Sequence, residues 1–413
     1  MEEIILKSNI ENLDSVLLEI EELISKLDLT PTMHQYAVER YESLKDYLKS
    51  VDESIIFHPH GSFMLGTTVR PYKEQMERSF DLDSICLFNK QSNQTKPITI
   101  RKDLETMLES NANYNSKLDY DDRCVTINYA GYGTLDFNID VVPSAIASDE
   151  TKQEMMKRGC LLEYVNTAIE VAEIKDNDKS KWISSNPQAY VKWFNDINQP
   201  FADTSRKSKK QRIFESNRNL YNTEEDVPEY FNKSSLQMAI QLLKRARDVF
   251  FSKKGKEKEN LKPISAIIST IVMDIAKNGM IPYDADVMEV VAIVIQEMKT
   301  YSEYQRLTEE DFRTRYFSKV TISKKNNHWE MWNPVNPKDN LVDRWNETPE
   351  CATLFFEWVS SLERTIAEIF DENNVEYTRS IGNMMGQSIV EDYYSNLKKP
   401  PVIDGGPRPW KLQ

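Results

Sequence analysis

Two aspartates interrupt an otherwise apolar run in the first quarter of the chain, in the sequence DLDSICLF at residues 81–88. A run of this length predicts a β-strand, in which side chains two residues apart lie on the same face. Asp81 and Asp83 are therefore expected to point together to one side of a sheet, with Leu82 on the other side. The alternative, a solvated edge strand, is disfavoured by the apolar residues that follow.

Neighbouring carboxylates on one face of a strand repel each other unless cations neutralise them. Two Mg²⁺ ions about 3.5–4 Å apart provide this neutralisation in polymerases and phosphatases. Because Mg²⁺ is suited to carboxylates and substrate phosphates, we expect Asp81 and Asp83 to be metal ligands and catalytic residues. Mn²⁺ is the alternative ion.

A third acid is expected from a neighbouring strand. The sequence TLDFNIDVV at residues 134–142 predicts that strand. Asp136 and Asp140 share one of its faces, with Asn138 between them. Their spacing alone does not choose between the two aspartates.

A glycine–serine pair, Gly61 and Ser62, precedes the first acids in the sequence HPHGSFML. Glycine lets the backbone approach a ligand closely, and backbone N–H groups and a hydroxyl at a helix start bind phosphates. The position of the pair before two acids therefore predicts a nucleotide-binding turn. His58 and His60, just before the turn, are expected to pack or hydrogen-bond. Arg70 is interpreted either as a phosphate contact or as part of an ion pair.

The bulk composition bounds the class of protein. The chain has 413 residues, 40% hydrophobic and 29% charged, which predicts a soluble protein larger than one compact core. It lacks a membrane-length apolar run, a secretory signal and a Cys/His cluster, so we expect a cytoplasmic protein without membrane contact or zinc. Its net charge of −14 argues against long nucleic acid as a partner. The main basic run, at residues 206–212, is interpreted as a solvated loop, and the alternative is contact with a phosphate-rich ligand.

Four regions are expected along the chain. They are N-terminal helices with a long spine helix at 1–53, an α+β core at 54–150, a helical lobe at 151–398, and a loosely ordered tail at 399–413. In the first region, Thr30 is expected to cap a helix that begins at Pro31 and runs to about Leu48. After Ser148 the strand signals fade, and helical periodicity recurs at 151–175, 235–251, 263–277, 285–300 and 351–371.

These motifs resemble the polymerase-β-type nucleotidyltransferase superfamily, whose pattern is a Gly-Ser turn, a D-x-D strand and a single acid on a later strand. The sequence IDVVPS at residues 139–144 resembles the third-acid strand of oligoadenylate synthases and their bacterial relatives. This resemblance favours Asp140 over Asp136 as the third catalytic and metal-binding acid. It implies a bilobed protein, with a mixed sheet and flanking helices, a helical lobe of the oligoadenylate-synthase-like type, and the active site in the cleft.

Further segments in the same order support the resemblance. The sequence LQMAIQLLKRARDVFF, at residues 236–251, resembles the helix that carries a phosphate-contacting lysine in those synthases, here Lys244. The segments KPISAIISTIV (262–272) and NPVNPKDNLVDRW (333–345) resemble a structural segment and a late Asn-Pro motif of the same group. The resemblance implies that Gly61, Ser62 and Lys244 bind the triphosphate. The alternative for Lys244 is a lysine on a solvated helix face.

Two departures indicate which branch the chain resembles. The clustered His/Cys set of animal cyclic GMP-AMP synthase is missing from the sequence, and the acidic balance differs from that of nucleic-acid-activated animal enzymes. Both favour the bacterial CD-NTases of CBASS anti-phage defence. That resemblance implies a synthase that joins ATP and other nucleoside triphosphates into a cyclic di- or trinucleotide second messenger, which acts on a separate effector. It also implies that ubiquitin-like machinery is a candidate partner for the C-terminus.

Two other functions are compatible with the same core. An RNA- or tRNA-tailing transferase requires a basic RNA track, which the net charge disfavours. An inactive nucleotide-binding module is the second alternative, but inactive relatives lose at least one acid, and here all three positions are filled.

Overall fold

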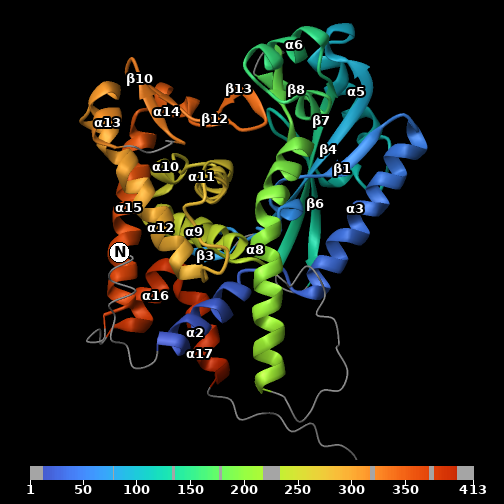
Figure 1. Cartoon of the computed structure of the whole chain (residues 1–413). Coiled ribbons are helices and arrows are strands. Elements are labelled where there is room, and N and C mark those ends of the chain that lie inside the picture. Colours follow the sequence, from blue (N-terminus) through green and yellow to red (C-terminus); the bar gives the residue numbers. More distant parts are fainter. Residues whose placement is uncertain are drawn as a thin grey trace, which may run out of the picture.

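The computed structural model describes residues 13–77, 79–132, 135–175, 179–216, 233–316, 321–371 and 376–397. Figure 1 shows two lobes, one built around a β-sheet and the other almost wholly helical. The predicted α+β architecture with a helical C-terminal part is therefore confirmed. The predicted tail, residues 399–413, lies outside the described residues.

The elements follow one another along the chain in two sets. Up to residue 185 they are α2 (Leu13–Ser25), α3 (Pro31–Val51), β1 (Ile56–Pro59), α4 (Gly61–Met64), β2 (Tyr72–Lys73), β3 (Met76–Glu77), β4 (Phe80–Gln91), α5 (Pro97–Glu109), β5 (Leu118–Tyr120), β6 (Val125–Tyr132), β7 (Leu135–Ile146), α6 (Asp149–Lys157), α7 (Leu162–Val165), β8 (Ile169–Lys175) and β9 (Lys179–Ser185). The rest are α8 (Pro187–Ser216), α9 (Ser235–Ser252), α10 (Lys256–Glu259), α11 (Ser265–Lys277), α12 (Val287–Ser302), α13 (Glu309–Arg315), β10 (Ser323–Lys325), β11 (His328–Glu330), β12 (Trp332–Asn333), β13 (Asn336–Asn340), α14 (Asp343–Glu347), α15 (Glu350–Ile369), α16 (Tyr377–Met385) and α17 (Gln387–Leu397).

A seven-stranded mixed sheet forms the first lobe. Its strand order is β1-β4-β7-β6-β5, with β8 paired to the last residues of β7 and β9 paired to β8. β4 and β7 are parallel, and every other pairing within this sheet is antiparallel. The two strands predicted to carry the acids are therefore direct neighbours.

One face of the sheet is buried against α3 and α5. Leu82 and Ile139, which alternate with the acids along β4 and β7, lie on this buried face. α3 begins as predicted, because Pro31 is its first residue and the hydroxyl of Thr30 accepts a hydrogen bond from the Met33 N–H at 3.3 Å. With one face covered, the alternate side chains are directed to the other face, where the acids lie.

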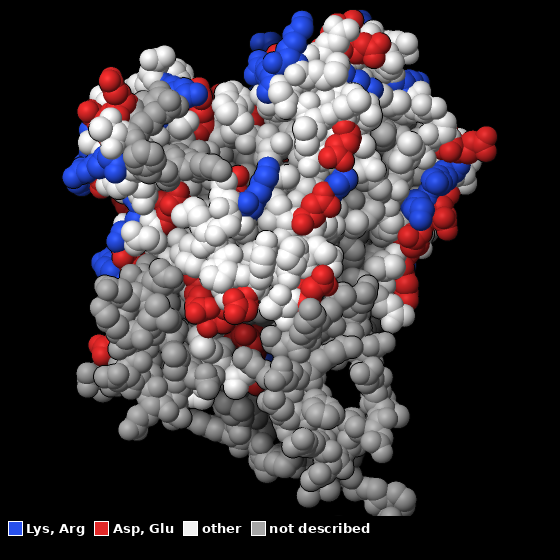
Figure 2. Space-filling view, viewed as in Figure 1, with Lys and Arg blue, Asp and Glu red and all other residues white. Residues whose placement is uncertain are grey.

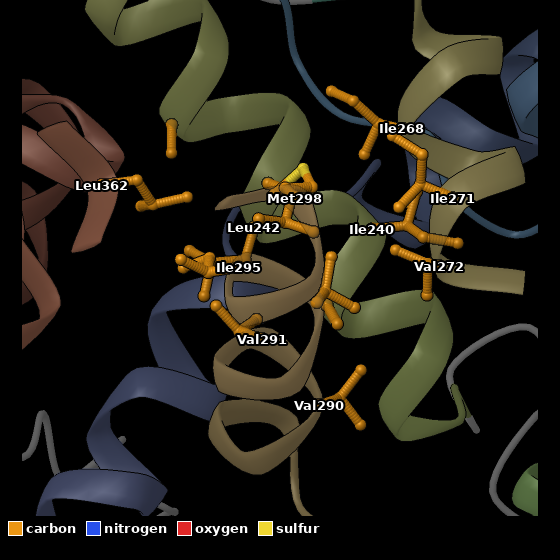
Figure 3. Close-up of a cluster of buried hydrophobic side chains, with 14 of the residues drawn as sticks. Ile240, Leu242, Ile268, Ile271, Val272, Val290, Val291, Ile295, Met298 and Leu362 are labelled. Atoms are coloured by element: carbon orange, nitrogen blue, oxygen red, sulfur yellow. The ribbon is translucent and has the colours of Figure 1, made fainter. Parts of the chain in front are cut away.

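Helix α9 forms the centre of the helical lobe. It packs against α8, α11, α12, α15 and α16. Figure 3 shows Leu242 of α9 close to Ile295 and Met298 of α12, with Leu362 of α15 facing the same cluster. None of the described helices combines the length and the apolar content needed to cross a bilayer.

Two expectations about the segments at 151–175 and 206–212 are wrong. Helical periodicity predicted a helix across residues 151–175, whereas β8 occupies Ile169–Lys175 and β9 follows, so the sheet continues to Ser185. β8 also buries Glu170 and Glu173, whose partners come from distant segments: the Thr151 hydroxyl donates to Glu170, and Lys181 pairs with Glu173. The basic run at 206–212 was expected to be a loop, but its backbone belongs to α8. The boundary at residue 150 stays a prediction.

Replacing Leu82 by Ala is expected to lower the free energy of unfolding by about 2–5 kcal/mol, because it leaves a cavity between the sheet and its covering helices. Leu82 is 1% exposed. The matched control is Ile56→Ala, since Ile56 lies in the adjacent strand β1 but is 53% exposed. Chemical denaturation measures both variants. Equal losses would contradict the assignment of the buried face.

Candidate active site

The predicted acids lie on adjacent parallel strands. In the pairing of β4 with β7, Asp83 is directly opposite Asp140, and Asp81 is opposite Asn138. All four side chains lie on the sheet face opposite Leu82. Asp136 precedes the first paired residues of β7, so the register places Asp140, rather than Asp136, beside Asp83.

Desolvation raises the pKa values of all three carboxyl groups, and the nearby Asp140 raises those of Asp81 and Asp83 further. Burial and then the nearby Asp140 and Asp81 raise the pKa of Asp83 to about 7. Desolvation by the surrounding protein and then Asp140 raise the pKa of Asp81 to about 6, although its side chain stays exposed at the surface. Burial also raises the pKa of Asp140. The site is therefore short of positive charge near neutral pH.

Two neutral side chains orient these acids. Asn138 donates an amide N–H to Oδ1 of Asp81 at 3.1 Å, and the hydroxyl of Thr126 donates to Oδ1 of Asp140 at 2.6 Å. Both bonds favour the ionised carboxylate and so oppose the rise in pKa. Sequence reasoning missed Thr126, because its role depends on the cross-strand pairing with Asp140.

The Gly61 turn is packed directly against Asp83. The backbone N–H of His60 donates to the carbonyl oxygen of Asp83 at 2.9 Å, which holds the start of α4 beside β4. Gly61 has φ +66°, and a Cβ built on it would lie 2.2 Å from Oδ2 of Asp83. Only glycine fits this position without moving the carboxylate. The structure therefore brings Gly61 and Ser62 next to the acids.

Several buried polar atoms around the turn have no hydrogen-bond partner among the described residues: His60 Nε2, Thr67 Oγ1 and Arg70 Nε. Burial lowers the pKa of His60 to about 4, and His58 lowers it further, so His60 is neutral at pH 7. No ion pair within the described part of the chain includes Arg70. Unpartnered polar atoms around a glycine turn are consistent with a site that binds a polar ligand.

Lys244 lies on α9, and its side chain reaches Thr67 in the segment that follows the Gly61 turn. Its ammonium donates to the carbonyl oxygen of Thr67 at 2.8 Å, and the side chain is buried. Burial, and secondarily the nearby Arg247, lower its pKa to about 7, while Asp83 acts in the opposite direction. The alternative of a solvated helix face is therefore wrong. The predicted phosphate contact stays a prediction, since Lys244 here binds backbone.

The donor set fits a divalent cation that is completed by substrate. Among the residues that the structure describes, no three His, Cys, Asp or Glu side chains converge closely enough to bind a metal by themselves. Mg²⁺ usually takes one or two carboxylates, substrate phosphate oxygens and water instead of an all-protein cage. The like-charged acids Asp81, Asp83 and Asp140 on one sheet face meet that requirement.

Comparisons with known proteins agree with this geometry. Residues 15–158 match the family model of the Second Messenger Oligonucleotide or Dinucleotide Synthetase domain. A c-di-GMP synthase from Roseivirga ehrenbergii is 27% identical over 341 residues, which cover 81% of this chain and 74% of that protein. The cyclic dinucleotide synthase CdnG from Bradyrhizobium diazoefficiens is 26% identical over 261 residues, 58% of this chain and 54% of that protein.

Solved structures share the fold over nearly the whole chain. The CdnG structure from Bradyrhizobium diazoefficiens, in complex with GTP, has a TM-score of 0.63 at 19% identity and covers 94% of this chain and 100% of that one. The E. coli MS115-1 CdnC structure with ATP has a TM-score of 0.55 at 13% identity and covers 90% of this chain and 97% of that one. The predicted nucleotidyltransferase fold is thereby confirmed.

Replacing Asp83 by Asn is expected to stabilise the metal-free protein at pH 8 by on the order of 1–3 kcal/mol. The pKa of Asp83 is raised from 3.8 to about 7 in the folded protein. From pH 4 to pH 7 the folded state therefore keeps a proton that the unfolded state has lost, and stability falls as the pH rises. Urea unfolding in EDTA at pH 4 and pH 8 measures this effect. If the free energy of unfolding differed between Asp83→Asn and wild type by the same amount at pH 4 and at pH 8, the raised pKa of Asp83 would be contradicted.

Proposed function

We propose that the chain is a nucleotidyltransferase of the CD-NTase group, which joins nucleoside triphosphates into a cyclic oligonucleotide and releases pyrophosphate. The match of residues 15–158 to the synthetase family model, the similarity to a c-di-GMP synthase and the shared fold support this proposal. One observation carries the proposal: Asp83 faces Asp140 across parallel strands and touches the Gly61 turn. This arrangement supports the proposal, because the backbone of Gly61 and Ser62, a candidate phosphate-binding turn, lies beside acids that could attract divalent cations. Both features are needed for nucleotidyl transfer.

Each group in the site has a proposed role. Asp81, Asp83 and Asp140 would hold two Mg²⁺ ions, which neutralise the triphosphate and lower the pKa of the attacking ribose hydroxyl. Thr126 and Asn138 would keep the carboxylates oriented. The acceptor hydroxyl attacks the α-phosphorus of the donor; the new P–O bond forms as the bond to the β-phosphate oxygen breaks, and pyrophosphate leaves. A second transfer within the linear product closes the ring.

Gly61 and Ser62 are proposed to bind the β- and γ-phosphates. The turn offers backbone N–H groups and the Ser62 hydroxyl, and it lies directly against Asp83. Solved relatives were obtained with GTP and with ATP, and we propose nucleoside triphosphates as substrates here. The separate effector and the attachment of the C-terminus remain predictions of the resemblance.

The tailing alternative needs a basic track for RNA. Figure 2 shows Lys and Arg side chains interspersed with Asp and Glu on the face that it presents, without a continuous basic stripe among the residues drawn in colour. The net charge of −14 acts in the same direction. A synthase of small nucleotides is therefore favoured over an RNA-modifying enzyme.

Asp83→Asn and Asp140→Asn are each expected to reduce pyrophosphate release by at least about 100-fold, because each removes a proposed metal ligand. Asp136→Asn is the matched control and should stay close to wild type. The assay uses radiolabelled nucleotides with Mg²⁺, phosphatase treatment and mass spectrometry of the product. EDTA should abolish the reaction. Loss of activity in Asp136→Asn with activity retained in Asp140→Asn would reverse the assignment of the third acid.

Gly61→Ala is expected to lower kcat/KM by about 100-fold, since its methyl group would displace the Asp83 carboxylate. Gly159→Ala is a suitable control, because Gly159 also has positive φ but has open space around its Cβ position. Both variants carry similar backbone strain. Comparable activity in the two variants would show that contact with Asp83 is unimportant.

A further inference from the structure

Four side chains of α9 bind the loop that follows the Gly61 turn. They lie on one face of the helix, at spacings of four, three and one residues. All four donate to backbone carbonyl oxygens: Gln237 to Leu65 at 2.8 Å, Gln241 to Thr68 at 2.6 Å, Lys244 to Thr67 at 2.8 Å and Arg245 to Arg70 at 3.1 Å. We call these four residues the carbonyl clamp.

The clamped loop is hydrogen-bonded to the turn itself. The N–H of Leu65 donates to the carbonyl of Gly61 at 3.3 Å, and the N–H of Thr67 donates to the carbonyl of Ser62 at 3.0 Å. A displacement of residues 65–70 therefore moves the proposed phosphate-binding groups. Since α9 is the central helix of the other lobe, the clamp fixes the turn relative to that lobe.

Arg245 differs from the other three residues because it binds in two directions. Its side chain is fully buried, and its Nε donates to the carbonyl of Met385 at 2.6 Å while its Nη1 donates to the carbonyl of Arg70. Its guanidinium also pairs with Glu77 and lies over the ring of Tyr72, 4.4 Å from the centroid. One cation therefore connects α16 with the loop that supports the turn.

The α16–α17 junction is shaped around this guanidinium. Gly386, between the two helices, has φ +91°, and a Cβ built there would lie 2.8 Å from Nη2 of Arg245. α17 is tied in turn to α2, where Tyr393 donates its hydroxyl to Glu22 at 2.6 Å. The C-terminal helices thus have a continuous path of contacts to the loop.

We propose that Arg245 is a positioning residue for nucleotidyl transfer, through which the C-terminal helices α16 and α17 set the placement of the Gly61–Ser62 turn. This inference rests on the proposed function. Arg245 touches neither the acids nor the turn directly, so it acts through the carbonyl of Arg70. Arginine is suited to this role because its planar fork serves several acceptors at once, which lysine does not match.

Arg247 offers a matched control on the same helix. It is also buried, but it donates to the carbonyl of Pro263 at 2.9 Å and the hydroxyl of Ser265 at 3.2 Å, and it pairs with Asp248. These partners all belong to the helical lobe. Removing either arginine takes away one member of an ion pair and the donor to at least one backbone carbonyl. Both variants therefore lose stability, but only Arg245 contacts the loop that follows the Gly61 turn.

The test compares Arg245→Met and Arg245→Lys with Arg247→Met. We expect Arg245→Met to raise the KM for the nucleoside triphosphate about tenfold, because ground-state binding by the turn is weakened, and Arg245→Lys to restore part of it. Amide hydrogen exchange across residues 61–70 should be faster in Arg245→Met. Arg247→Met should leave both measurements within about twofold of wild type, even if its unfolding midpoint falls equally.

Two failures can be told apart. A wild-type protein that forms no cyclic product contradicts the proposed function. In that case, the role of Arg245 is decided by the dissociation constant of the nucleoside triphosphate and by amide hydrogen exchange across residues 61–70. An active wild type whose KM and loop exchange are unchanged by Arg245→Met overturns that role. Should Arg245→Met not fold, Gln241→Leu is the second variant, because Gln241 is uncharged and binds the same loop. Unchanged KM and exchange in Gln241→Leu overturn the clamp.

Discussion

Parallel pairing between β4 and β7 sets the distance and direction of every acid in the site. Side chains alternate across a sheet, so a shift of one residue in this register would turn Asp140 into the apolar layer beneath the sheet. The buried Ile139 opposes such a shift of β7, because its side chain would leave the apolar core and become exposed on the other face. The apolar core under α3 and α5 therefore maintains the electrostatics of the opposite face.

The helical lobe supplies none of the three acids Asp81, Asp83 and Asp140, but it holds the loop that follows the Gly61 turn in place. α9 supplies side-chain donors to a loop whose backbone carbonyls would otherwise face a buried environment without partners. This arrangement satisfies the hydrogen-bonding groups of the loop and fixes it at the same time. The two lobes therefore contribute different parts of the candidate site: the sheet presents the acidic side chains, and the helical lobe fixes the loop that follows the Gly61 turn.

Local patterns in the sequence were sufficient for much of this description. The period-two spacing of Asp81 and Asp83 predicted their common face, and Thr30 with Pro31 predicted a helix start. Features that depend on partners far along the chain were not predictable in the same way. β8 has apolar spacing that also suits a helix, and its buried Glu173 pairs with Arg123, which lies 50 residues earlier in the chain.

In the candidate site, too, local sequence patterns predicted some residues, while others became recognisable only through their contacts in the structure. The spacing of Asp136 and Asp140 left both open, a family resemblance favoured one, and the strand register places Asp140 opposite Asp83. The roles of Thr126 and Gln241 could not be read from the sequence, since a threonine in a strand and a glutamine in a helix are common and only their contacts give them meaning.

The lowered pKa of Lys244 has a chemical consequence. Burial disfavours the charged form of this amine, and its hydrogen bond to the Thr67 carbonyl is neutral on the acceptor side. An anionic group that came close to Lys244 would favour the charged form and raise this pKa again. The binding of such an anion near neutral pH would therefore be accompanied by proton uptake.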